Sequence, residues 1–152
     1  MYAKEAQKLQ TTLLKWLYNG KKKDRYFYQE IDNYIYISNG YTVHRVFKPM
    51  WFLDLNAMET INMKKVLETS ETLYDATLTN EIKEIDKGHV RAFKLNDPQG
   101  TKVWVNEKYL KEYGMDNLAE LQAKGGTNIS PIRFYTDSEE VEMLVLPVRM
   151  TE

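Results

Sequence analysis

The hydrophobic residues of this chain change their spacing several times, and each change predicts a new element. From Ala3 to Tyr18 the apolar side chains recur with the 3.6-residue period of a helix. They are Ala6, Leu9, Leu13, Trp16 and Leu17. Asn19-Gly20 follows as a helix C-cap pattern, so one amphipathic helix is predicted over residues 3–18.

Between residues 26 and 47 the period changes from 3.6 to two. Tyr34, Tyr36 and Ser38 alternate with isoleucines, and Asn39-Gly40 then gives a strong hairpin pattern. A strand at 26–31 is predicted to precede this hairpin. The many tyrosines suit a half-exposed sheet, and they also suit a stacking surface for single-stranded nucleic acid.

The rest of the chain alternates short strands with short helices. Thr60 or Asn62 is expected to cap a helix ending at Thr69, with Met63, Val66 and Leu67 facing inward. Strands are predicted at 77–85, 89–95, 102–105, 132–135 and 141–148. Helices are predicted at 106–113 and at about 116–124, each ended by glycine. The pattern predicts one α+β domain over residues 1–152 with mainly antiparallel sheets.

The run from Glu142 to Met150 is apolar almost throughout and is typical of a strand buried on both faces. Pro147 cannot donate a hydrogen bond to a neighbouring strand, so pairing should loosen there. The residues after it, Val148, Arg149 and Met150, are then expected at a surface. They are either the ragged end of a core strand or part of a binding site.

Composition narrows the classes of function. The chain has 152 residues, 43% of them apolar and 28% charged, as in a soluble single-domain protein. It has no cysteine, which excludes disulfides and thiolate chemistry. It carries no phosphate-binding loop, dinucleotide glycine pattern or zinc-protease motif, so an enzyme, a cofactor or a metal is not expected. No signal peptide or membrane span is evident, which predicts a cytoplasmic protein.

A basic face is present although the formal net charge is −1. Lys4, Lys8 and Lys15 fall in one narrow arc of the predicted first helix, opposite its apolar side. A basic run containing Lys22 follows that helix. Lysines at one-turn spacing can each neutralise a backbone phosphate, and the alternative is a merely solvated face.

The C-terminal third resembles the last domain of bacterial sliding clamps, the β subunits of replicative DNA polymerases. The stretch Val103-Trp104-Val105-Asn106-Glu107-Lys108-Tyr109-Leu110 is similar to that family's strand leading into an asparagine-capped helix. Ile132 to Ser138 is similar to its next strand and acidic turn. Leu144-Val145-Leu146-Pro147-Val148-Arg149-Met150 is similar to its terminal motif, and the hairpin Tyr34 to Phe47 to an earlier one.

This resemblance implies a DNA-clamp-like α+β domain, with two main helices packed on antiparallel sheets, and a non-enzymatic role. The implied DNA contacts are Lys4, Lys8, Lys15, Lys22, Lys108 and Lys111. The implied peptide-binding residues are Leu146, Pro147, Val148, Arg149 and Met150. In the family, the corresponding apolar pocket receives short motifs of polymerases and repair proteins.

The chain also departs from that family. A bacterial clamp subunit has three such domains, so closing a ring would need a homo-oligomer of six copies of this chain. The family's pocket also takes residues from a preceding domain that has no counterpart here. Two functions therefore stay open. One is a clamp-like accessory protein, suited to a phage or mobile element, that binds double-stranded DNA, replication proteins or both. The other is a stand-alone protein-interaction module, a decoy or regulator, without nucleic-acid binding.

Overall fold

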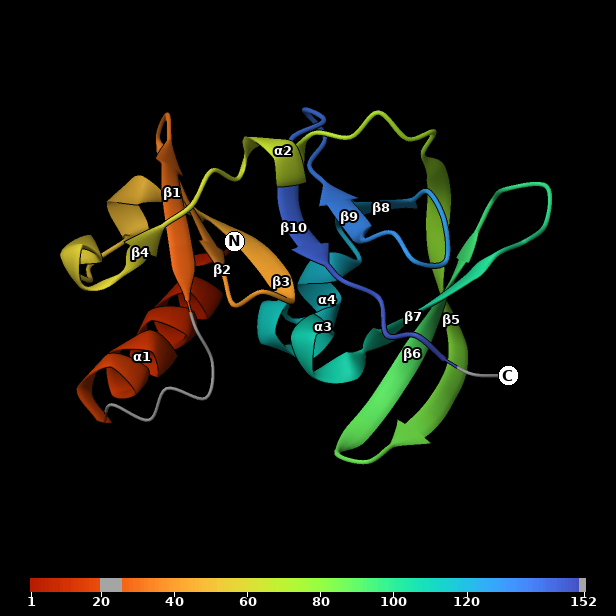
Figure 1. Ribbon diagram of the computed structural model, residues 1–152, viewed down its shortest axis with the longest axis horizontal. Helices are drawn as coiled ribbons and strands as arrows, with labels where there is room; N and C mark the ends of the chain where they lie inside the picture. Colours follow the sequence, from red (N-terminus) through yellow and green to blue (C-terminus); the bar gives the residue numbers. More distant parts are fainter. Residues whose placement is uncertain (20–25, 151–152) are drawn as a thin grey trace. The chain divides into compact units, whose positions relative to one another are not determined.

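The computed structural model describes residues 1–19 and 26–150, excluding the side chains of residues 15–19 and 57. The chain divides into two compact units, Met1–Thr69 and Ser70–Glu152 (Figure 1). The first unit contains a long helix and a small sheet. The second contains a larger sheet with two short helices.

Helix α1 (Ala3–Asn19) confirms the predicted first helix, and its buried face follows the expected period. Ala6, Gln10 and Leu13 on this face are fully buried. Gln10 is the unexpected member, because a buried amide must be hydrogen-bonded to be stable. Its Nε2 donates to the Met50 carbonyl at 2.9 Å, and its Oε1 accepts from the Phe52 amide at 2.6 Å. Gln10 therefore ties α1 to the chain around the 3-10 helix η1 (Lys48–Met50).

The sheet of the first unit has the order β4-β1-β2-β3. Its strands are β1 (Phe27–Ile31), β2 (Tyr34–Ser38), β3 (Thr42–Phe47) and β4 (Glu59–Thr60). Strands β1, β2 and β3 pair antiparallel, whereas β4 lies parallel to β1. The predicted hairpin is confirmed as β2–β3. Its loop is held by Asn39, whose Oδ1 accepts from the Tyr41 and Thr42 amides, each at 2.9 Å, while Gly40 adopts φ +91°.

A hydrophobic cluster joins α1 to this sheet. Leu13 packs with Ile35, Ile37 and Met58, all buried. Half-buried residues surround them. Among these are Leu9 of α1, Tyr28 of β1, and Trp51, Leu53 and Leu55 from the segment that leads into the 3-10 helix η2 (Leu55–Ala57). Because Tyr28 packs here and Tyr36 is buried, these two rings offer little face for base stacking.

The helix predicted to end at Thr69 is shorter than expected. Helix α2 spans only Lys64–Leu67 and follows Met63, which supplies no side-chain cap. Asn62 still contributes, because its Oδ1 accepts from the Lys64 amide at 3.1 Å. Met63 is buried as predicted, but Val66 is exposed. A single turn cannot bury a full apolar face, which explains why Val66 points outward.

The second unit is built on six strands in the order β10-β9-β8-β5-β6-β7, each antiparallel to its neighbours. The strands are β5 (Tyr74–Ile85), β6 (Gly88–Leu95), β7 (Lys102–Asn106), β8 (Gln122–Gly125), β9 (Ile132–Tyr135) and β10 (Val141–Val145). Phe93 and Phe134 meet edge to face in its core, with ring centroids 5.8 Å apart.

Helix α3 (Glu107–Tyr113) confirms the predicted helix and both of its ends. The Asn106 Oδ1 accepts from the Lys108 amide at 3.1 Å, which is the capping role that its position predicts. Gly114 ends the helix with φ +99°, and α4 (Met115–Leu118) follows directly. Helix α3 packs on β6 and β7 and buries Tyr109, Leu110 and Tyr113.

Two predictions in this unit are wrong. The helix predicted over about 116–124 ends at Leu118, and Gln122–Gly125 instead forms β8, which pairs with β5 on one side and β9 on the other. Pairing along both edges outweighs a weak local helix preference. The last strand ends at Val145 rather than Val148. Pro147 lies just beyond it, where a proline stops sheet pairing.

The fold class is confirmed as α+β with mainly antiparallel strands. The clamp-like arrangement stays a prediction. Among the described residues, no helix has both the length and the apolar character needed to cross a membrane.

Candidate functional site

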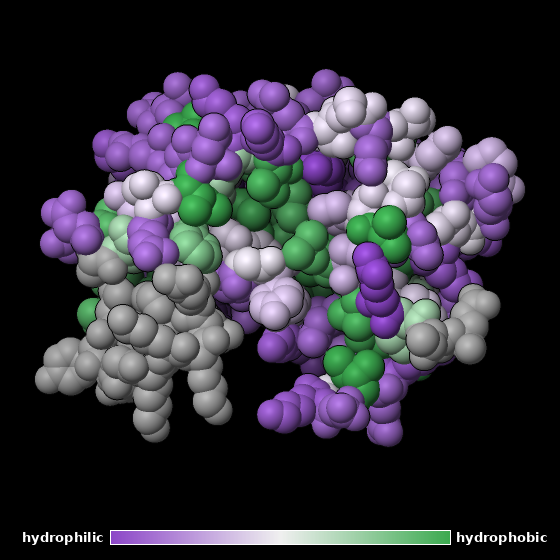
Figure 2. Space-filling model, viewed as in Figure 1, coloured by the Kyte–Doolittle hydropathy of each residue, from purple (hydrophilic) through white to green (hydrophobic). Residues whose placement is uncertain are grey.

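A groove of about 930 Å³ lies in the second unit. It is lined by the C-terminal segment Val148–Met150, and its lining also includes Trp104 and Ile129. Charged residues of β5 and β7, among them Lys83, complete it. On the face seen in Figure 2, hydrophobic side chains lie among hydrophilic ones around the C-terminal segment. The lining is therefore mixed rather than purely apolar.

The C-terminal segment is held against β7 by a backbone hydrogen bond. After β10 ends at Val145, the Val148 amide donates to the Trp104 carbonyl at 2.7 Å. Strand β7 pairs with β6 through its other edge and is the outer strand of the unit's sheet. The segment therefore covers part of an otherwise open strand edge.

Trp104 is the largest side chain of the groove and is half-buried. The Lys83 ammonium lies over its indole ring, 4.7 Å from the ring centroid. This is a cation–π contact, which orients the lysine without neutralising it. On the solvent side of the same groove, Ile129 is 59% exposed. An aromatic ring and an aliphatic side chain thus stand open to a ligand.

Two other groove residues form an exposed ion pair. The Lys102 Nζ lies 2.8 Å from the Glu81 Oε1, and the two side chains are 48% and 46% exposed. Pairs of this exposure contribute little to stability. The main consequence of this pair is electrostatic, because the positive charge of Lys102 and the negative charge of Glu81 cancel locally.

The turn before β7 is fixed by Asp97. Its carboxylate accepts from the Thr101 amide at 2.8 Å and, through a second short contact, from the Thr101 hydroxyl. These hydrogen bonds from Thr101 lower the pKa of the Asp97 carboxyl below its ordinary value. Thr101 and Gly100, at φ +61°, line the groove, so the turn gives its rim a defined shape.

The loop that carries Ile129 is also held by side chains. The Ile129 amide donates to the Thr127 Oγ1 at 3.3 Å, and the hydroxyls of Thr127 and Ser130 lie 2.7 Å apart. The Ser130 hydroxyl in turn donates to the Glu71 carboxylate at 2.8 Å. Ile129 is therefore exposed on an ordered loop, an arrangement that lowers the entropy lost on binding.

The groove takes in part of the predicted peptide-binding set. Val148, Arg149 and Met150 line it, whereas Leu146 and Pro147 lie outside its lining. Lys83, Thr101 and Ile129 were not predicted as site residues, because they come from elements far apart in the sequence. Trp104 was singled out only as part of the family-like stretch before α3.

The predicted DNA-binding lysines lie in different parts of the chain. Lys4 and Lys8 are exposed on α1. Lys22 and the side chain of Lys15 lie outside the described residues. Lys108 and Lys111 are exposed on α3, and the Lys108 ammonium lies 4.9 Å from the Tyr109 ring centroid. A shared surface of these lysines stays a prediction.

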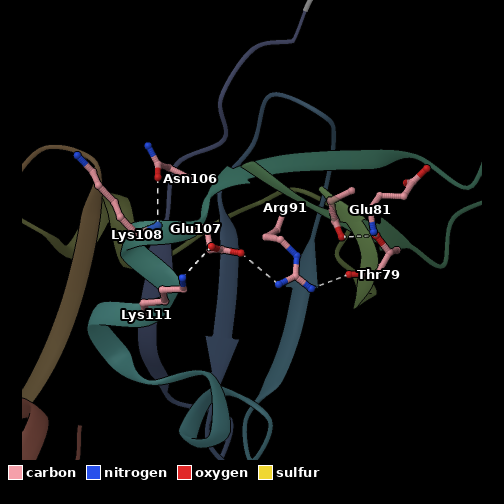
Figure 3. A network of polar contacts seen from close by, with 8 residues as sticks. Thr79, Glu81, Arg91, Asn106, Glu107, Lys108 and Lys111 are labelled. Atoms are coloured by element: carbon pink, nitrogen blue, oxygen red, sulfur yellow. Dashed lines mark hydrogen bonds and ion pairs between the residues drawn. The ribbon is translucent and has the colours of Figure 1, made fainter. Parts of the chain in front are cut away.

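Lys111 takes part in an ion-pair network that fixes α3 (Figure 3). Its Nζ lies 2.9 Å from the Glu107 Oε1, and the Glu107 Oε2 lies 3.3 Å from the Arg91 Nη1. Arg91 also donates to the Thr79 carbonyl at 3.0 Å, so the network links α3 to β6 and β5. Hydrogen bonds from Lys111 and then Arg91 lower the pKa of the Glu107 carboxyl. Glu107 is shared by Lys111 and Arg91, so its single negative charge offsets only part of the charge of Lys111.

Within residues 1–19 and 26–150, no three or more carboxylates, histidines or thiols gather closely enough to hold a metal ion. Comparison with protein-family models, curated proteins and solved structures finds no match. The resemblance to sliding clamps therefore depends on the quoted sequence stretches alone and stays a prediction.

Proposed function

We propose that this chain is a non-enzymatic protein-binding module whose groove receives a short, extended segment of a partner protein. The observation that carries the proposal is that Val148–Met150, Trp104 and Ile129 line one groove within one unit. Other parts of the same chain thereby complete the groove around the terminal segment.

The physical character of the groove suits such a ligand. Peptide recognition uses an aromatic or aliphatic contact for affinity and a strand edge for direction. Trp104 and Ile129 provide the first. The part of the outer edge of β7 that Val148 leaves open provides the second. A volume of about 930 Å³ is large enough to receive more than one side chain of a peptide.

The class of partner comes from the resemblance to sliding clamps. It suggests motifs of polymerases or other replication proteins, in a cytoplasmic, clamp-like accessory role. Binding of double-stranded DNA belongs to the same proposal and is supported by the exposure of Lys4, Lys8 and Lys108. The peptide groove is favoured over DNA binding as the principal function because its residues gather in one unit.

A selection from a phage-displayed library of random twelve-residue peptides tests the proposal. The immobilised wild-type protein should enrich related peptides, and Val148→Glu should abolish their binding because it places a charge in the groove wall. Val66→Glu is the matched control, since Val66 is exposed on α2 and lies outside the groove. Failure of the wild-type protein to enrich any sequence, or equal loss in both variants, would overturn the proposal.

A further inference from the structure

We propose that the groove selects acidic peptide segments, whose carboxylates pair with Lys83 and Arg149. This inference rests on the proposed peptide-binding function and names the chemistry of the partner. It follows from the charges that line the groove, because complementary charge is what separates the right partner from wrong ones.

The described residues that line the groove carry an excess of positive charge. Among them, Lys83, Lys102 and Arg149 are basic, whereas Glu81 is the single carboxylate. Glu81 is 2.8 Å from Lys102, so these two charges cancel locally. Lys83 and Arg149 then remain, and neither forms an ion pair with a carboxylate in the part of the chain that the structure describes. The groove consequently presents two positive charges to a ligand.

The Lys83 side chain is already oriented for this role. Its ammonium lies 4.7 Å from the centre of the Trp104 ring, so it is held beside the main aromatic contact surface. A cation–π contact leaves the full charge available for a carboxylate. A peptide with an acidic residue next to an aromatic or aliphatic one would pair with Lys83 while contacting Trp104 or Ile129.

A peptide suits these contacts better than a single-stranded nucleic acid, the other common acidic ligand. Base stacking needs an open aromatic face, and Lys83 occupies one face of Trp104. An extended peptide does not need a free ring face, and the part of the β7 edge that Val148 leaves open suits its backbone.

The same random-peptide selection tests the inference by reversing the groove's charge. Peptides enriched by the wild-type protein should contain Asp and Glu about three-fold more often than the unselected library, as expected from complementary charges. Lys83→Glu/Arg149→Glu should reverse this preference toward Lys and Arg. The control is Lys64→Glu/Lys87→Glu, the same charge change at exposed positions outside the groove. It should retain the wild-type preference.

Titration of one enriched acidic peptide then measures the contribution of each cation. Lys83→Gln and Arg149→Gln should each weaken binding about two- to five-fold at low salt, as partly exposed ion pairs do. An oligonucleotide of twelve thymidines should not compete. Enrichment without acidic residues, or no reversal in the charge-swapped variant, would overturn this inference and leave peptide binding standing. Competition by the oligonucleotide would also overturn it, whereas a selection that enriches nothing would overturn both proposals.

Discussion

The backbone amide of Val148 donates to the carbonyl of Trp104 over 2.7 Å, and this bond ties the C-terminal segment to the edge of β7. The chain reaches this position because β10 ends at Val145, before Pro147. The segment has therefore left one strand and lies against another. This arrangement makes one wall of the groove.

Val148→Pro should release the segment, because proline has no amide hydrogen to donate. We expect a loss of about 1 kcal/mol in the free energy of unfolding, the usual net value of one such bond. Loss of peptide binding should accompany it. Urea denaturation and peptide titration measure the two effects.

Val148→Ala is the control for that substitution, since it keeps the amide and removes only part of a half-buried side chain. It should be more stable than Val148→Pro and should retain most peptide binding. Equal stability and equal peptide binding of the two variants would show that the hydrogen bond to Trp104 does not hold the segment.

Glu107→Gln should destabilise the protein near neutral pH by about 1–3 kcal/mol, because it weakens a charged network around Arg91 and Lys111. The pKa of the Glu107 carboxyl is lowered in the folded protein from an ordinary value of 4.5. Its stabilising contribution is therefore complete above that ordinary value and is lost as the pH falls through the lower folded value. Denaturant unfolding from pH 7 down to pH 3 should show the two proteins converging in acid.

Glu84→Gln supplies the comparison, since the Glu84 side chain is 88% exposed. Its effect at pH 7 should stay within about 0.5 kcal/mol. If Glu107→Gln behaved in the same way across this pH range, the network would have no role in holding α3.

Gln10→Ala should be among the more damaging changes in the first unit. It leaves the Phe52 amide and the Met50 carbonyl without the partner that each has in the native protein. We expect a loss of about 2–3 kcal/mol, because buried polar groups without hydrogen bonds are costly. Gln7→Ala, at an exposed position of α1, is the control and should leave stability nearly unchanged. Thermal unfolding compares the two variants, and equal unfolding temperatures would refute this role of Gln10.

The predicted DNA contacts can be tested separately from the groove. Filter binding of a DNA duplex over a salt series gives the slope of the logarithm of the binding constant against the logarithm of the salt concentration. Each lysine that contacts a phosphate should contribute about −0.9 to this slope. Lys4→Ala/Lys8→Ala should reduce the slope, whereas Lys64→Ala/Lys65→Ala on α2 should not. Lys111→Ala should have less effect than Lys108→Ala, because the Lys111 ammonium already contacts the Glu107 carboxylate. Affinity without salt dependence would exclude this mode of DNA binding.

Local patterns predicted the elements that local interactions stabilise. Helix α1 follows its apolar period, and Asn106 and Gly114 define the ends of α3. Asn39-Gly40 forms the predicted turn of the β2–β3 hairpin. Strand β8 was missed because Gln122–Gly125 carries no strong strand pattern of its own and depends on partners from β5 and β9. The bonds of Gln10 to Met50 and Phe52 were missed for the same reason, as they span about forty positions.

In the candidate site, too, the features set by local sequence were predicted and those set by distant contacts were not. Pro147 correctly indicated where the last strand would loosen and that Val148–Met150 would reach a surface. The rest of the groove lining could not be predicted, because Lys83, Trp104 and Ile129 meet only through the pairing of distant strands and a folded loop. Sequence periodicity reports which face is buried, but it does not report which distant residues share a groove.

The central claim is that Val148–Met150 and Trp104 bind a peptide together, and nuclear magnetic resonance tests it most directly. Titration of an enriched peptide into ¹⁵N-labelled protein should shift the Trp104 indole and the amides of Ile129 and Val148. The amides of β1 in the first unit should stay unchanged. Shifts confined to the first unit, or binding that leaves Trp104 and Val148 unchanged, would contradict the claim.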